Sequence, residues 1–187
     1  MRVISGSFKG KKIFEPKDNK TRPLKDLAKE SIFNIIEHSN KLNTQLINSN
    51  ILDLFSGVGS FGIECLSRGS KKVVFVENYS GVLPILKKNL LSLKIDKKYE
   101  ILENDIYNDK ILSKLNNKFD IVFLDPPFKD KKLKEFLLKL KNFELLNQNG
   151  LIIIHRHKDD NDNFSEKFKV VEEKKYGISK ISFLTNL

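Results

Sequence analysis

The residues best suited to chemistry stand together directly after an apolar segment. Asp125-Pro126-Pro127-Phe128 follows Phe119–Leu124, a run typical of a buried strand. Two prolines cannot continue a central strand, so the chain must leave the sheet there in a rigid loop. Because both prolines lack amide hydrogens, the carbonyl of Pro126 is left free as an acceptor beside the Asp125 carboxylate.

A carboxylate beside a fixed carbonyl suits the methylation of an exocyclic amine on a purine base. Such an amine is a poor nucleophile because its lone pair is delocalised into the ring. Two acceptors that hold its two hydrogens favour a pyramidal nitrogen and stabilise the positive charge that develops on it. Stacking of Phe128 on the base would contribute about 1–3 kcal/mol. We therefore predict that Asp125, Pro126, Pro127 and Phe128 are catalytic, the alternative being an ordinary loop with a core phenylalanine.

A glycine motif after an earlier apolar segment predicts a second part of the site. Ile51–Phe55 is typical of a buried strand, and Gly57, Gly59 and Gly62 follow it at the start of a helical segment. Glycines at this spacing permit a tight turn and let a ligand approach the backbone at a helix N-terminus. The same spacing fits a dinucleotide-binding motif, with Glu77 as its acid, and it also fits glycines that serve only strand–helix packing.

Asp53 distinguishes the two possible cofactors. Its carboxylate would repel a diphosphate but would attract a cationic amino-acid group, which favours S-adenosylmethionine over NAD. Glu77 can accept hydrogen bonds from the ribose of either molecule. Asp105 can accept from an adenine amino group beside Ile106, or it can form a plain turn. The predicted cofactor-binding residues are Asp53, Phe55, Gly57, Glu77, Gly59, Asn78, Asn104, Asp105 and Ile106.

Strand-like and helix-like segments alternate from Ile51 onward, as in βαβ units around a parallel sheet. A terminal antiparallel hairpin is indicated by Lys167–Lys175 and Lys180–Leu184. We predict an α/β fold of the Rossmann-like class, with a mostly parallel seven-stranded sheet that ends in this hairpin. The five preceding strands are expected at Ile51–Phe55, Lys72–Glu77, Tyr99–Leu102, Phe119–Leu124 and Leu151–His155. Helices are expected at Phe61–Arg68, Val82–Leu93, Asp109–Leu115 and Leu133–Leu140.

The first 45 residues predict a basic arm ahead of this domain. Arg2–Phe14 places short apolar and basic residues around two glycines, which is typical of a β-hairpin. Apolar residues then recur at helical spacing from Leu24 to Ile36. We therefore place a hairpin-and-helix arm at residues 1–45 and the cofactor-binding domain at residues 46–187.

The composition restricts the setting and the partners. A net charge of +10 suggests a polyanionic partner, although drift toward lysine codons could also produce it. The one cysteine, the absence of a signal peptide and the lack of a membrane-length apolar run predict a cytoplasmic protein with no membrane partner. His155 and His157 have only the distant His38 as a companion, so we predict no metal site and leave an RNA contact open for this pair.

The order of the motifs resembles that of class I amino-methyltransferases. The resemblance rests on four features in this order: Asp53 followed by the glycine motif, an acid after the second strand, Asn104-Asp105 after the third and Asp125–Phe128 after the fourth. Further segments of the sequence resemble those of the RsmD-type 16S ribosomal RNA guanine-N2 methyltransferases. They are Arg2–Gly6, Lys9-Gly10, Arg22-Pro23, Glu30, Phe33-Asn34, Leu52–Gly69 and Tyr176-Gly177, and they extend over almost the whole chain. The sequence departs from this pattern at Leu24 and Leu27, where threonine and arginine are common.

The resemblance implies that the chain methylates one guanine N2 in small-subunit ribosomal RNA, in an assembled or assembling particle. S-adenosylmethionine is then the cofactor, and the arm helps to hold RNA; we also expect a monomer. The arm residues predicted to contact RNA are Arg2, Lys9, Lys11, Lys12 and Arg22. Three alternatives stay open: methylation of adenine N6 in DNA or RNA, NAD-dependent oxidoreduction, and RNA binding without catalysis.

Overall fold

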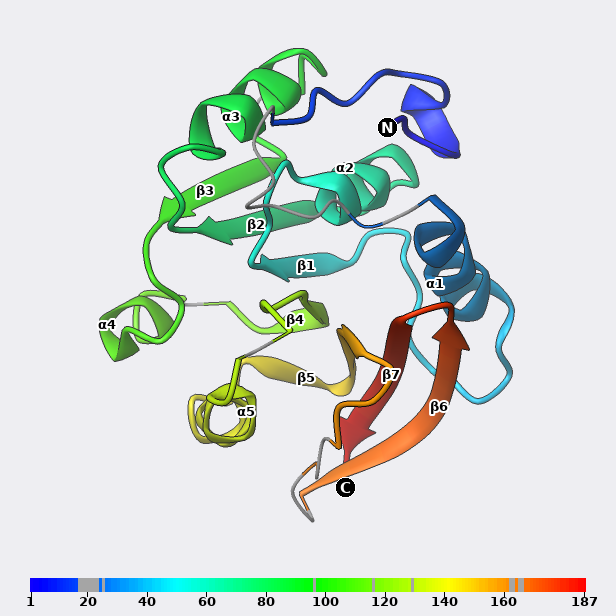
Figure 1. The fold of residues 1–187 in the computed structure, drawn as a ribbon, viewed down its shortest axis with the longest axis vertical. Helices are drawn as coiled ribbons and strands as arrows, with labels where there is room; N and C mark the ends of the chain where they lie inside the picture. The colour runs from blue at the N-terminus through cyan, green and yellow to red at the C-terminus, as the bar shows by residue number, and fades with distance from the viewer. Residues whose placement is uncertain are drawn as a thin grey trace.

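A seven-stranded sheet runs through the centre of the protein (Figure 1). The computed structural model describes residues 1–16, 24, 26–95, 97–115, 117–128, 130–161, 164 and 167–187. Its strands are β1 (Asn50–Leu54), β2 (Lys72–Glu77), β3 (Tyr99–Glu103), β4 (Phe119–Leu124), β5 (Leu146–His157), β6 (Phe168–Tyr176) and β7 (Ser179–Asn186). Its helices are the 3-10 helix η1 (Gly6–Phe8) and the α-helices α1 (Asp26–His38), α2 (Ser60–Ser67), α3 (Leu83–Leu91), α4 (Asp109–Leu112) and α5 (Leu133–Asn142).

The strand order is β3-β2-β1-β4-β5-β7-β6. The first five strands in this order are parallel, and β7 runs antiparallel to both β5 and β6. The predicted Rossmann-like sheet with a C-terminal antiparallel hairpin is therefore confirmed. β5 begins at Leu146, earlier than the predicted Leu151, because a register shift lets Leu146 pair with Phe119.

Helices cover both faces of the sheet. Successive strand residues point to opposite sides, and both sides of these strands carry buried apolar residues. Ile51 belongs to an apolar cluster that includes α1, α2 and α3, and its neighbour Leu52 belongs to the cluster of α4 and α5. Figure 1 shows these two sets of helices on the two sides of the sheet. None of the helices in the described part of the chain has the length and apolar character needed to cross a membrane.

The N-terminal segment is not the regular hairpin that its sequence suggests. The amides of Val3, Gly10 and Ile13 donate to the carbonyls of Lys11, Val3 and Met1, so residues 1–3 do pair with residues 10–13. The pairing amounts to one β-bridge, between Arg2 and Lys12, and η1 lies between its two arms. The reason is that α2 supplies other acceptors for this backbone. The Glu64 carboxylate accepts from the amides of Ile4 and Ser5, at 2.8 and 2.9 Å, and Ser67 Oγ accepts from the amide of Phe8 at 2.9 Å.

The buried apolar residues described among the first 45 share the core of the rest of the chain. Val3, Ile13 and Phe33 are buried in the same cluster as Ile51 of β1. The division between an arm at 1–45 and a domain at 46–187 stays a prediction about function. In packing, the core crosses the predicted boundary.

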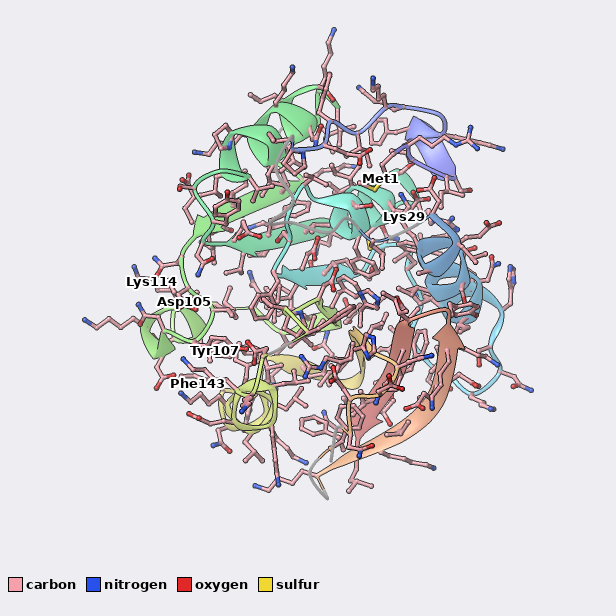
Figure 2. All side chains as sticks on the ribbon, viewed as in Figure 1. Met1, Lys29, Asp105, Tyr107, Lys114 and Phe143 are labelled. Atoms are coloured by element: carbon pink, nitrogen blue, oxygen red, sulfur yellow. The ribbon has the colours of Figure 1, made fainter. Side chains whose placement is uncertain are left out.

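A buried lysine joins α1, α2 and the N-terminal segment. Lys29 is 0% exposed, and its Nζ donates to the carbonyl of Arg2 at 2.8 Å and to Ser60 Oγ at 3.3 Å. It also lies 3.8 Å from Glu64. Burial lowers the pKa of Lys29, and the Glu64 carboxylate opposes that shift. Figure 2 shows Lys29 beside Met1, whose Sδ contacts Ser60 Oγ at 3.0 Å. The start of the chain is therefore held by a buried ionic contact.

The contact between η1 and α2 requires a glycine at position 6. Gly6 has φ +80°, and an added Cβ would lie 2.0 Å from the carbonyl oxygen of Ser67. Gly10 has nearly the same backbone conformation, φ +82°, but an added Cβ would meet nothing within 4 Å. The two glycines therefore share the conformational requirement and differ in the space around them.

We expect Gly6→Ala to destabilise the protein more than Gly10→Ala. Both variants place alanine in the left-handed region, at a cost of about 1–2 kcal/mol. Gly6→Ala must also displace the backbone at Ser67, which adds about 1–3 kcal/mol, as overpacking does. Urea unfolding followed by circular dichroism gives both free energies of unfolding. Equal losses in the two variants would contradict the close approach of η1 to α2.

Candidate functional site

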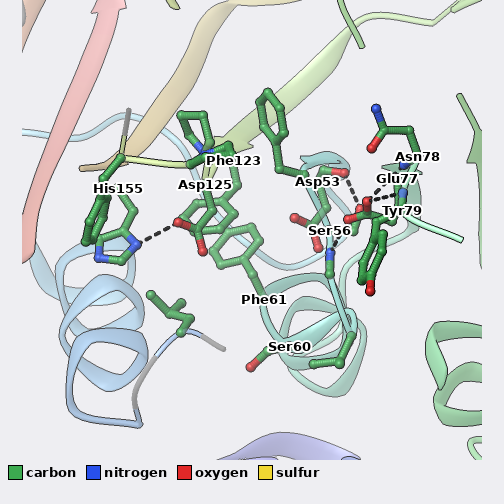
Figure 3. Close-up of a pocket in the computed structure, with 17 residues that line it drawn as sticks. Asp53, Ser56, Ser60, Phe61, Glu77, Asn78, Tyr79, Phe123, Asp125 and His155 are labelled. Atoms are coloured by element: carbon green, nitrogen blue, oxygen red, sulfur yellow. Dashed lines mark hydrogen bonds and ion pairs between the residues drawn. The ribbon is translucent and has the colours of Figure 1, made fainter. Parts of the chain in front are cut away.

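A cavity of about 650 Å³ lies at the carboxyl ends of β1, β2, β4 and β5. The helices that follow β1 and β4 pack on opposite faces of the sheet, which leaves a crevice between these strands. Most of the predicted catalytic and cofactor residues line this cavity (Figure 3). They are Asp53, Phe55, Gly57, Glu77, Asn78, Asp125, Pro126, Pro127 and Phe128.

The four other predicted cofactor residues lie near the cavity or at its margin. Gly59 is the N-cap residue of α2. Asn104 and Ile106 line a small hollow that shares Phe55, Glu77 and Asn78 with the main cavity. Asp105 is exposed and lines neither space, and its Oδ1 accepts from the amide of Tyr107 at 3.0 Å. Asp105 thus forms the turn that was the alternative interpretation.

Asp53 is a buried carboxylate beneath the glycine turn. It is 1% exposed, and its Oδ2 accepts from the amide of Gly62 at 3.0 Å. A side chain at position 62 would lie 2.9 Å from this oxygen and 2.3 Å from the Phe75 ring, so the contact requires glycine. Burial raises the pKa of Asp53 well above its usual range, although the Gly62 amide opposes the shift. The carboxylates of Asp125 and Glu77 raise it further, so this position favours a positive charge.

Glu77, at the end of β2, connects two loops through its carboxylate. Oε2 accepts from the amide of Gly57 at 2.7 Å, and Oε1 accepts from the amides of Asn78 and Tyr79 at 2.9 and 2.8 Å. A carboxylate offers about four acceptor positions. Three of those at Glu77 are used within the protein, so about one is left for a ligand in the cavity.

Asp125 and Pro126 are neighbours in the lining of the cavity. Asp125 Oδ1 is 2.8 Å from His155 Nδ1 (Figure 3). Among the described residues, none donates a hydrogen bond to Asp125 Oδ2 or to the carbonyl of Pro126. Within the described part of the chain, both groups are therefore left available as acceptors, and their catalytic role stays a prediction.

The loop after these acceptors is held from two sides. The guanidinium of Arg156 donates to the carbonyl of Pro127 at 3.1 Å and to that of Asp130 at 3.0 Å. The Tyr107 hydroxyl donates to the Asp130 carboxylate at 2.7 Å, and burial is the main cause of the raised pKa of Tyr107. These contacts link the loop to β5 and to the segment that follows β3. The loop is therefore fixed by side chains as well as by its prolines.

Phe128 packs against two histidine rings. Its centroid is 5.9 Å from that of His155 and 5.3 Å from that of His157, both in edge-on geometry. Phe55, on the other side of the cavity, has φ +58° and packs on Tyr107 at 5.9 Å. A bulky residue in this conformation stores strain of about 1–3 kcal/mol, and such strain concentrates at functional sites.

His155 and Leu24 line the cavity, although no place in the site was predicted for either from the sequence. One signal for His155 was accessible: it stands at the end of the fifth predicted strand, as Asp125 follows the fourth. In the sheet, Leu124 pairs with Ile154, so the next residue on each strand lies side by side at the same edge. Register between strands decides this contact, and a single sequence does not reveal register.

None of the predicted RNA-contacting residues that the structure describes lines the cavity. Arg2, Lys9 and Lys12 are exposed. Lys11 instead donates from Nζ to the carbonyl of Ser92, so its side chain is tied to the end of α3. Arg22 lies outside the described residues.

The chain is similar to a family model, to named methyltransferases and to a solved structure. Residues 1–185 match the family model described as "Conserved hypothetical protein 95". The "Ribosomal RNA small subunit methyltransferase D" of Haemophilus influenzae is 35% identical to this chain, over 95% of this chain and 90% of that protein. The Escherichia coli protein of the same name is 30% identical, over 82% and 73%. The solved structure of "Putative methyltransferase yhhF" from Escherichia coli has a TM-score of 0.81 at 25% identity, and covers 100% of this chain and 97% of that one.

Because the pKa of Asp53 is raised in the folded state, ionisation of this carboxyl lowers the free energy of unfolding. The folded state keeps the proton to higher pH than the unfolded chain, so stability falls as pH rises above the ordinary value of 3.8 and levels off above the raised pKa. We therefore expect Asp53→Asn, which keeps an acceptor for Gly62, to be more stable than the wild type at neutral pH, by roughly 0.5–2 kcal/mol.

Denaturant unfolding of both proteins across pH 4–8 measures this effect. The advantage of Asp53→Asn should shrink as the pH falls toward 4, because the carboxyl of the unfolded wild type then begins to take up the proton that the folded state already holds. An advantage that does not change with pH would mean that the ionisation of Asp53 is not its cause.

Proposed function

The chain belongs to the RsmD-type family, whose model is described as Conserved hypothetical protein 95, and from this premise we propose that it methylates guanine N2 in small-subunit ribosomal RNA. The methyl donor in this proposal is S-adenosylmethionine. One observation carries the proposal: Asp125 and Pro126 line one cavity with Asp53, a buried carboxylate suited to a cation, and none of the described residues donates to Asp125 Oδ2 or to the Pro126 carbonyl.

The two acceptors provide what an exocyclic amine needs. Asp125 Oδ2 and the Pro126 carbonyl each accept one hydrogen of the amine, which turns the nitrogen lone pair away from the ring. The negative charge of Asp125 stabilises the positive charge that develops on the nitrogen. Because the loop is already fixed, little reorganisation is needed during the reaction.

The cavity residues also fit the methyl donor. S-adenosylmethionine supplies, when bound, a methyl group on a sulfonium centre that an amine can attack. Asp53 would hold the cationic amino-acid end. A neighbouring cation would lower the pKa of this carboxyl, and among the described residues no cationic side chain does so. Glu77 has about one acceptor position left for a ribose hydroxyl. The hollow beside Asn104 and Ile106 would receive the adenine.

The apolar side of the cavity supports a base as the other substrate. Leu24, Phe61, Phe123 and Phe128 line the cavity together with Asp125. A base that leaves its stack and enters such a pocket can be held by ring contacts and by acceptors for its edge. The exposed residues Arg2, Lys9 and Lys12, with Lys11 and Arg22, would contact phosphates outside it. In this proposal a monomer in the cytoplasm acts on an assembled or assembling small subunit.

Asp125→Ala tests the mechanism. We expect this variant to bind S-adenosylmethionine with wild-type affinity but to transfer methyl groups at least about 100-fold more slowly, because one preorganised acceptor is lost. The rate is measured as transfer of the tritium-labelled methyl group from the cofactor. The substrates are small subunits from cells that lack this methylation, and the RNA extracted from those subunits. Calorimetry gives the affinity. Asp109→Ala, on the exposed surface of α4, is the matched control and should keep the wild-type rate.

Several outcomes would count against the proposal. Near-normal turnover of Asp125→Ala would contradict the role of the two acceptors. Mass spectrometry of the labelled nucleosides should find N2-methylguanosine, whereas N6-methyladenosine would replace guanine by adenine as the target. Tight binding of NAD with no transfer of label would overturn the reaction class. Binding of RNA without label in any substrate would indicate a non-catalytic module.

A further inference from the structure

His155 connects the proposed catalytic carboxylate to the C-terminal hairpin. Its Nδ1 is 2.8 Å from Asp125 Oδ1, and its Nε2 is 2.8 Å from Ser179 Oγ. The three residues come from the ends of β4 and β5 and from the start of β7. Figure 3 shows the His155 ring facing the Asp125 carboxylate at the cavity wall. Both side chains are largely buried, with 10% of His155 and 20% of Asp125 exposed.

The two contacts determine which nitrogen of His155 carries the proton. A carboxylate only accepts hydrogen bonds, so Nδ1 must be the donor to Asp125. Nε2 of a neutral ring is then an acceptor, and the Ser179 hydroxyl can donate to it. The ring orientation is thus fixed at both nitrogens. This arrangement leaves Asp125 Oδ2 as the carboxylate oxygen available to a ligand.

A carboxylate at this position needs such a partner. The terminal torsion of an aspartate side chain is broad, so without a second contact its two oxygens could exchange or turn from the cavity. Arg156 does not supply that contact, because its guanidinium holds the carbonyls of Pro127 and Asp130. The neighbouring residues of β5 therefore act on different parts of the loop, with His155 on the carboxylate and Arg156 on the backbone.

We propose that His155 is a positioning residue for methyl transfer: its Nδ1–H holds Asp125 Oδ1, so that Oδ2 faces the amine, and Ser179 fixes the ring. This inference rests on the proposed function, because it assigns a purpose to the orientation of Asp125. It requires His155 to act through Asp125 and to contact neither the cofactor nor the base.

A matched pair of variants separates positioning from packing. In His155→Asn the amide nitrogen takes the place of Nδ1 and can still donate to Asp125, whereas His155→Leu fills the space without a donor. We expect His155→Leu to lower kcat by about 10- to 100-fold, as misplacement of a reacting group does, with unchanged affinity for S-adenosylmethionine. His155→Asn should recover most of the lost kcat. Thermal unfolding of each variant shows whether it is folded.

Equal kcat in His155→Leu and the wild type would overturn the inference, and so would equal losses in the leucine and asparagine variants. Nitrogen-15 NMR of His155 gives a readout that does not depend on activity. We expect the Nδ1–H tautomer in the wild type and its loss in Asp125→Ala. The Nε2–H tautomer in the wild type would also overturn the inference. An NMR result as expected, in a wild type that methylates no RNA, would refute the proposed function and with it the purpose assigned to His155, although the contact itself would stand.

Discussion

Three carboxylates stand together at the carboxyl ends of neighbouring strands, and the rest of the site depends on keeping them there. Asp53 is the penultimate residue of β1, Glu77 ends β2 and Asp125 follows β4, and all three line one cavity. Burial is the main cause of the raised pKa of Asp53, and repulsion from the carboxylates of Asp125 and Glu77 adds to it. The fold accommodates each differently. Asp53 accepts one amide, Glu77 accepts three, and Asp125 is paired with His155.

The elements around the cavity follow from these requirements. The glycine turn brings the amides of Gly57 and Gly62 to Glu77 and Asp53, and Gly62 has no room for a side chain. Asn89 of α3 holds this turn from the other side, since its Nδ2 donates to the carbonyl of Val58 at 3.0 Å. The same Nδ2 donates to the carbonyl of Phe14 at 3.1 Å. The N-terminal segment therefore supports the cofactor side of the cavity as well as carrying basic residues.

Local chemistry made much of the site predictable. A proline pair after an apolar run ends a strand wherever the strand lies in the sheet, so the position of the Asp125 loop needed no knowledge of packing. Asp53 and Glu77 could be placed near strand ends because each stands toward the end of an apolar run, with the glycine motif following the first run. His155 could not be found in this way, because its contact depends on the register of β5 against β4 and β7. The hairpin predicted at the N-terminus is present as backbone bonds between residues 1–3 and 10–13, but it is irregular because Glu64, 60 residues later in the chain, accepts from the amides of Ile4 and Ser5.

The cavity and the whole chain differ in the sign of their charge, and this difference affects how an RNA substrate would bind. The chain carries a net charge of +10, but Asp53, Glu77 and Asp125 make the cavity acidic. Phosphates are attracted to lysine and arginine side chains and are repelled by grouped carboxylates. A base carries no such charge, and its amine needs acceptors. The phosphate backbone is therefore favoured outside the cavity and the base inside it, which separates the contacts that position an RNA from those that carry out the reaction.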